Sequence, residues 1–161
     1  MKDSVLLDTS FFIRLMKKDD PIHQNAIGYF RYFLENDITP ICSTISIAEY
    51  CVRGRYDELP WKNLKVIPFN FDHGIKAGEF ARIVFEQRNG VSLSNRNIIP
   101  NDSKLFAQAA LEESVKSFVT SDEECLKVFS LINNKLNPHF DIINIRTPYN
   151  ETYGLINFGE G

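Results

Sequence analysis

Two acidic residues directly follow short apolar runs, a position typical of active-site carboxylates. Asp8 comes after the run Val5-Leu6-Leu7, and Asp122 follows residues 118–121, which read Phe-Val-Thr-Ser. If the runs are parallel strands, their carboxyl ends form one edge of a sheet, which is where open α/β sheets bind ligands. Helix capping is the structural alternative for either residue, because Asp is a favoured N-cap. The sequence alone leaves both roles open.

Two further acids share spacing with apolar residues on predicted helices. Glu49 falls on the stripe formed by Ile45, Ala48 and Val52. Asp102 precedes an apolar stripe at residues 105, 106 and 109 in the same way. A carboxylate on a core-facing stripe is costly unless it is paired or bound to a cation. A buried salt bridge is the alternative, but neither stripe contains Lys or Arg.

Together these acids predict a metal site. Several carboxylates that converge on one crevice repel each other, and a hard divalent cation relieves the repulsion. Oxygen ligands suit Mg²⁺ or Mn²⁺, and a site of this kind can support metal-assisted phosphodiester hydrolysis. The expected ligands are four in number: Asp8, Glu49, Asp102 and Asp122.

The surrounding elements are expected to alternate between strand and helix. Short apolar runs predict strands at 4–7, 40–42, 66–69, 117–120 and 140–145, and apolar 3–4 spacing predicts helices near 11–16, 21–35, 44–52, 72–85, 101–110 and 122–131. This order predicts a single α/β domain, a three-layer α/β/α sandwich with a central, mostly parallel sheet of four to five strands. Residues 88–97 are expected to form a polar loop.

Composition excludes several other classes. Three cysteines without a C-x-x-C pair and three dispersed histidines give neither a disulfide framework nor a zinc motif. The sequence contains no glycine-rich phosphate-binding motif and no run of apolar residues long enough to span a membrane, and it begins without a signal peptide, so a cytoplasmic protein is expected. The net charge of −3 argues against nucleic-acid binding by bulk charge. Without the four proposed ligands, however, 17 acids remain against 18 bases.

The sequence resembles the PIN domain, and within it the VapC-type toxin ribonucleases. The resemblance covers about residues 4–146 and is carried by four segments in the family's order: Leu6-Leu7-Asp8-Thr9-Ser10, Ser46-Ile47-Ala48-Glu49-Tyr50, residues 101–107, and Val119-Thr120-Ser121-Asp122. Two positions depart from the family's pattern. Ser10 stands where members often have Asn, and Cys125 stands near a position that is often aromatic.

The resemblance implies a function and a division of the chain. It implies a PIN-like nuclease domain over 1–146 and a C-terminal tail over 147–161. It implies a metal-dependent endoribonuclease, the toxin of a toxin–antitoxin pair, with the four acids as metal ligands and Thr120 as a hydroxyl residue of the catalytic site. The implied partners are an RNA substrate, a cognate antitoxin protein and a second copy in a homodimer.

The same acidic residues admit rival functions. The first is a PIN-like module that binds RNA or protein without cleaving. A haloacid-dehalogenase-type phosphatase would need a D-x-D pair, where this chain has Asp8-Thr9-Ser10. A response regulator would need an acidic pair beside the first strand, but Asp19-Asp20 lie well beyond it.

Overall fold

The computed structural model describes residues 1–87 and 98–155. Within them lies a five-stranded sheet with the order β3-β2-β1-β4-β5, in which every neighbouring pair is parallel. The strands are β1 (Ser4–Leu7), β2 (Thr39–Ser43), β3 (Lys65–Ile67), β4 (Val115–Thr120) and β5 (Asp141–Asn144). All five predicted strands are present, and the predicted fold class is confirmed.

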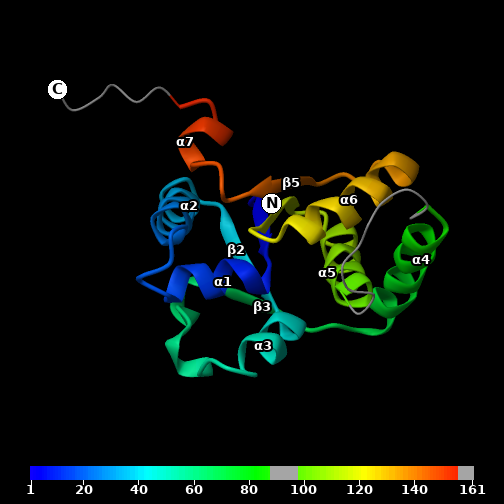
Figure 1. The fold of residues 1–161 in the computed structure, drawn as a ribbon, viewed down its shortest axis with the longest axis horizontal. Coiled ribbons are helices and arrows are strands. Elements are labelled where there is room, and N and C mark those ends of the chain that lie inside the picture. Colours follow the sequence, from blue (N-terminus) through cyan, green and yellow to red (C-terminus); the bar gives the residue numbers. More distant parts are fainter. Residues whose placement is uncertain (88–97, 156–161) are drawn as a thin grey trace.

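Helices cover both faces of the sheet (Figure 1). They are α1 (Thr9–Met16), α2 (His23–Glu35), α3 (Thr44–Tyr50), α4 (Phe71–Gln87), α5 (Ile98–Leu111), α6 (Glu123–Leu136) and α7 (Tyr149–Thr152). Helices α4, α5 and α6 pack together on one face, and α1, α2 and α7 lie on the other. The predicted loop at 88–97 lies outside the described residues.

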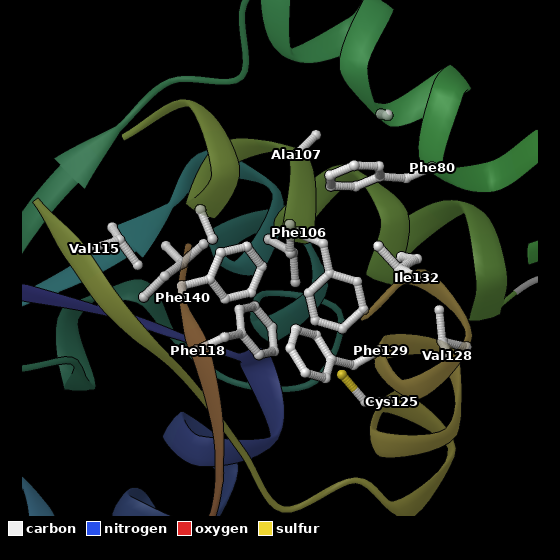
Figure 2. Close-up of a cluster of buried hydrophobic side chains, with 14 of the residues drawn as sticks. Phe80, Phe106, Ala107, Val115, Phe118, Cys125, Val128, Phe129, Ile132 and Phe140 are labelled. Atoms are coloured by element: carbon white, nitrogen blue, oxygen red, sulfur yellow. The ribbon is translucent and has the colours of Figure 1, made fainter. Parts of the chain in front are cut away.

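Strand periodicity divides the interior into two cores. On β1, Leu6 faces the α4–α5–α6 side, whereas Val5 and Leu7 face the α1–α2 side. The first core contains a group of aromatic rings from α5, β4, α6 and Phe140, the residue before β5 (Figure 2). All four residues of β1 are buried, because helices cover both faces of the centre of the sheet, as is usual for parallel sheets.

Several predicted helix bounds differ from the structure, and for two of the helices, α2 and α3, local contacts show why. Helix α2 begins at His23 instead of Pro21, because the Asp20 carboxylate accepts a hydrogen bond from Ile22 N and holds a turn before the helix. Helix α3 ends at Tyr50, so Val52 lies beyond it and is 78% exposed, and Ala48 is exposed too. The buried residues of α3 are Ser46 and Tyr50.

The last described residues pack against α2. Tyr29 donates a hydrogen bond to Thr147 O (2.6 Å), and Tyr153 stacks on Tyr32 with ring centroids 4.3 Å apart. The Tyr149 ring lies so close to Gly28 that a side chain there would meet it at 2.8 Å. The boundary between a domain at 1–146 and a tail at 147–161 therefore stays a prediction, but the start of that tail is seated on α2.

Candidate active site at the carboxyl edge of the sheet

The parallel sheet brings Asp8 and Asp122 together. Leu7 and Val119 are register partners of β1 and β4, and Asp8 N donates to Val119 O (2.9 Å). Each Asp is the N-cap residue of the helix that follows its strand, α1 or α6. The Asp122 side chain accepts from Glu124 N (2.9 Å) and caps α6, whereas the Asp8 side chain makes no capping hydrogen bond. Helix capping therefore accounts for part of the role of the Asp122 side chain, but it does not account for the presence of an aspartate at position 8.

Two hydroxyls hold the Asp8 carboxylate. Its Oδ2 accepts from Ser10 Oγ (2.7 Å) and from Thr120 Oγ1 (2.8 Å), and the residue is 6% exposed. Burial raises the pKa of Asp8, the two hydroxyls oppose that rise, and the negative charge of Asp122 adds to it. The carboxylate is therefore fixed in place while its charged form remains unfavourable.

Thr120 connects the two aspartates. Its hydroxyl donates to Asp8 Oδ2 and accepts from Asp122 N (3.0 Å), and its side chain is fully buried. Ser10 Oγ accepts from Ser121 N (3.0 Å) while it donates to Asp8. The residue that departs from the family's pattern at position 10 therefore ties the ends of β1 and β4 together.

Glu49 and Asp102 reach the same edge from helices α3 and α5. Glu49 Oε1 and Asp102 Oδ2 are buried and have no hydrogen-bond partner. Burial raises the pKa of Glu49, and the charge of Asp8 adds to the rise, whereas Thr9 and the Lys104 ammonium oppose it. The Glu49 carboxylate is therefore close enough to Asp8 for their charges to interact.

Asp102 is the most perturbed acid. Burial raises its pKa to about 9, and the charges of Asp8, Asp122 and Glu49 contribute to the rise. Such a shift means that the four acids lie near enough to one another to repel. An unpartnered buried carboxylate oxygen costs free energy unless a proton or a cation satisfies it.

The donor set fits a hard divalent cation in chemistry. It consists of carboxylate oxygens, two of them without a partner, and it contains no nitrogen or thiolate ligand. The distances between these side chains are longer than a metal centre needs. Within residues 1–87 and 98–155, no three His, Cys, Asp or Glu side chains come together closely enough to hold an ion. The four carboxylates converge without reaching ligand distances.

Two cavities flank these carboxylates. The larger, about 840 Å³, is mainly apolar and lies beside Thr9 and Glu49, with Ile13, Met16 and Val52 in its wall. The smaller, about 480 Å³, lies beside Asp122 and is lined by Ser10, Ser121 and two arginines, Arg14 and Arg146. From the sequence alone, Arg146 was assigned no role. No sequence signal marks it, since its place depends on a contact with Ser121 O (3.1 Å) from a distant strand end.

The comparison with known proteins supports the fold of this chain, and it does not assign a more specific function. No family model and no curated protein matches the sequence. Solved structures do match: a chain of the VapBC2 complex of Rickettsia felis bound to a promoter DNA fragment has a TM-score of 0.57 at 19% identity, over 88% of this chain and 98% of that one. A chain of the DNA-bound VapBC complex of Salmonella typhimurium has a TM-score of 0.57 at 18% identity, over 90% and 99%.

A third match is a toxin alone. Mycobacterium tuberculosis VapC20, described as a toxin that cleaves the sarcin–ricin loop, has a TM-score of 0.52 at 15% identity, over 76% of this chain and 93% of that one. The predicted resemblance to VapC-type PIN domains is thus confirmed at the level of the fold. No helix in the described part of the chain is long and apolar enough to cross a membrane.

Proposed function

We propose that the protein is a metal-dependent endoribonuclease and the toxin of a toxin–antitoxin pair. The observation that carries the proposal is the convergence of four carboxylates at the carboxyl edge of a parallel sheet, two of them with buried, unpartnered oxygens. The shared fold supports it, because one solved neighbour is described as an RNA-cleaving toxin and two belong to VapBC complexes.

The residues divide into ligands and a positioning group. Asp8, Glu49, Asp102 and Asp122 would hold Mg²⁺ or Mn²⁺, which when bound would polarise a phosphoryl oxygen and lower the pKa of a water. Ser10 and Thr120 orient the Asp8 carboxylate through hydrogen bonds to Oδ2. Since the Thr120 hydroxyl is fully buried and engaged on both sides, its role is to position Asp8 and the backbone of Asp122.

The proposed partners follow from the same comparison and from the surface. An antitoxin protein is supported by the VapBC neighbours, and the apolar cavity beside Glu49 offers exposed Ile13, Met16 and Val52 to a protein chain. A homodimer, and action in the cytoplasm on RNA, complete the proposal.

A cleavage assay tests the proposed function. The chain is incubated with a broad panel of RNAs in Mg²⁺, in Mn²⁺ and with EDTA, and products are resolved on gels. We expect cleavage that requires the metal and falls by about a thousandfold in Asp8→Asn, because a ligand carboxylate worth several kcal/mol is lost. Asp19→Asn is the matched control, since Asp19 is exposed and lies outside both cavities.

Two results would contradict the proposal. Activity that survives both Asp8→Asn and Asp122→Asn would remove these acids from the site. No cleavage across the whole panel, with RNA still bound, would favour the rival function of a PIN-like module that binds without cutting.

A further inference from the structure

Arg146 is fixed beside Asp122 from three directions. Its backbone N donates to Asn144 Oδ1 (3.0 Å), and its carbonyl accepts from Asn25 Nδ2 (3.2 Å) on α2. Its side-chain Nε donates to Ser121 O (3.1 Å), one residue before Asp122. Strand β5 brings it there, because Asn144 pairs with Thr120 and Ile145 N donates to Thr120 O (3.0 Å). The side chain is therefore held at the carboxyl edge before any ligand arrives.

The guanidinium of Arg146 keeps its terminal nitrogens available. The residue is exposed, and among the described residues no carboxylate lies within ion-pair distance of it. Arg14, which lines the same cavity, differs, because its Nη1 is paired with Asp20 Oδ2 at 2.6 Å. Holding an arginine in place while leaving its charge unpaired is an arrangement suited to an anionic ligand.

The lining of the cavity of about 480 Å³ carries both signs of charge. It includes three acids, among them the proposed ligand Asp122, and two arginines, Arg14 and Arg146. With a cation held at Asp122, a phosphodiester in this cavity would have that cation and the Arg146 guanidinium to balance its negative charge. A guanidinium fork also matches two oxygens of one phosphate.

We propose that Arg146 binds a backbone phosphate of the RNA substrate on the Asp122 side of the cleaved bond. The inference rests on the proposed function, because it takes the carboxylates as the cleavage site and RNA as the ligand. Arg146 is a binding residue in this role, and Asn144 and Asn25 position it.

RNA binding measured against salt concentration tests the inference. The full-length chain carries Asp8→Asn so that bound RNA stays intact, and a fluorescently labelled single-stranded RNA of mixed sequence is titrated by anisotropy in Mg²⁺. On this background we compare Arg146→Ala, Arg146→Lys and Arg31→Ala. Arg31 is the matched control, because it is an exposed arginine on α2 that lines neither cavity of the site.

Loss of one phosphate contact has a defined signature. We expect Arg146→Ala to weaken binding by about tenfold and to reduce the slope of log K against log salt by about one. Arg146→Lys should keep most of the slope, since it keeps the charge, and Arg31→Ala should change neither quantity. A merely structural role for Arg146 would lower the thermal unfolding midpoint without moving the slope.

The outcomes separate the inference from the proposed function. If Arg146→Ala matches Arg31→Ala in affinity and slope while the unmutated chain cleaves RNA, the inference is wrong and the function stands. If the slope depends on Arg146 but the unmutated chain cleaves nothing, the phosphate site stands and the nuclease proposal is wrong. If no RNA binds, both are wrong.

Discussion

Two buried clusters lie one helical turn apart in this protein. One consists of aromatic rings that pack together, and the other consists of carboxylates that repel one another. The aromatic cluster, defined here as Phe106, Phe118, Phe129 and Phe140, packs between the sheet and α5 and α6 (Figure 2). The carboxylate cluster, defined as Asp8, Glu49, Asp102 and Asp122, lies at the end of the same sheet. Asp102 and Phe106 even share α5 at positions i and i+4.

The clusters differ in whether their side chains have favourable partners. The rings of Phe106 and Phe118 meet edge to face with centroids 4.8 Å apart, and both side chains are fully buried. The carboxylates repel one another, and two of their buried oxygens have no partner. We infer that the aromatic cluster stabilises the fold and that the carboxylate cluster lowers the stability of the metal-free protein.

Truncating the aromatic cluster should give the largest change in stability. Phe106→Ala removes a fully buried ring and leaves a cavity among three other rings, so we expect the free energy of unfolding to fall by about 3–5 kcal/mol. Urea unfolding followed by circular dichroism measures it. Phe71→Ala is the control, because Phe71 is 81% exposed and its loss should change stability by less than about 0.5 kcal/mol. Equal effects of the two variants would mean that the cluster is not a core.

In the carboxylate cluster, a substitution is expected to raise the free energy of unfolding instead of lowering it. Because the pKa of Asp102 is raised to about 9, the folded protein must bind a proton at this carboxyl at pH 7. Asp102→Asn removes that cost, so without metal it should raise the free energy of unfolding by about 2 kcal/mol at pH 7. Asp141→Asn, at an exposed position on β5, should leave it unchanged. A destabilised Asp102→Asn in EDTA would show that the carboxylate is satisfied in the metal-free protein and would break the contrast between the clusters.

The same prediction has a pH dependence whose sign follows from the pKa. Burial and the neighbouring charges raise the pKa of Asp102 to about 9 in the folded state, far above the unfolded value. The folded state therefore holds a proton that the unfolded state releases, and stability falls as pH rises from about 4 to 9, by at most about 1.4 kcal/mol per pH unit. Asp102→Asn should flatten this slope in EDTA. A bound Mg²⁺ should restore stability most at the high end of the range, because it then competes with fewer protons.

Within the carboxylate cluster, the sequence predicted the acids at strand ends more reliably than Glu49 on its helix. The strand ends carrying Asp8 and Asp122 follow from parallel pairing, which puts the carboxyl ends of strands on one edge. The helical stripe that justified Glu49 was wrong, because α3 ends at Tyr50 and Ala48 and Val52 are exposed. On a short helix at a sheet edge, the packing of the neighbouring elements decides which side is buried, and 3–4 spacing has too few turns to show it.

Arg146 was missed for a related reason. Its partners, Asn25 and Ser121, are remote in sequence and reach it through backbone carbonyls and a side-chain amide, which leave no pattern of residue types. The division between a domain at 1–146 and a tail at 147–161 stays a prediction, and the sequence did not show that Tyr29 on α2 donates a hydrogen bond to Thr147 O. Local patterns predicted the elements, while contacts between distant segments determined the details of the site.

Thr120→Val is the finest test of the comparison, because Thr120 lies between the two clusters on β4, two residues beyond Phe118. Valine fills nearly the same volume, so the packing of β4 should survive. It cannot donate to Asp8 Oδ2 or accept from Asp122 N, which releases the carboxylate and leaves a buried N–H unsatisfied. We expect metal-dependent cleavage to fall by about ten- to a hundredfold, as losses of groups that orient metal ligands usually do.

Thr120→Ser separates position from packing. Serine keeps the hydroxyl and loses only a methyl group, so it should retain most of the cleavage rate even if it is somewhat less stable. Rates measured at saturating RNA, alongside urea unfolding of both variants, distinguish the two effects. If valine proved as active as threonine, the hydroxyl would have no part in holding Asp8, and Ser10 alone would orient that carboxylate. If serine were as impaired as valine, the methyl contact of Thr120 would matter more than its hydrogen bonds. Thr120 would then belong with the packed residues of the aromatic cluster and not with the carboxylate cluster.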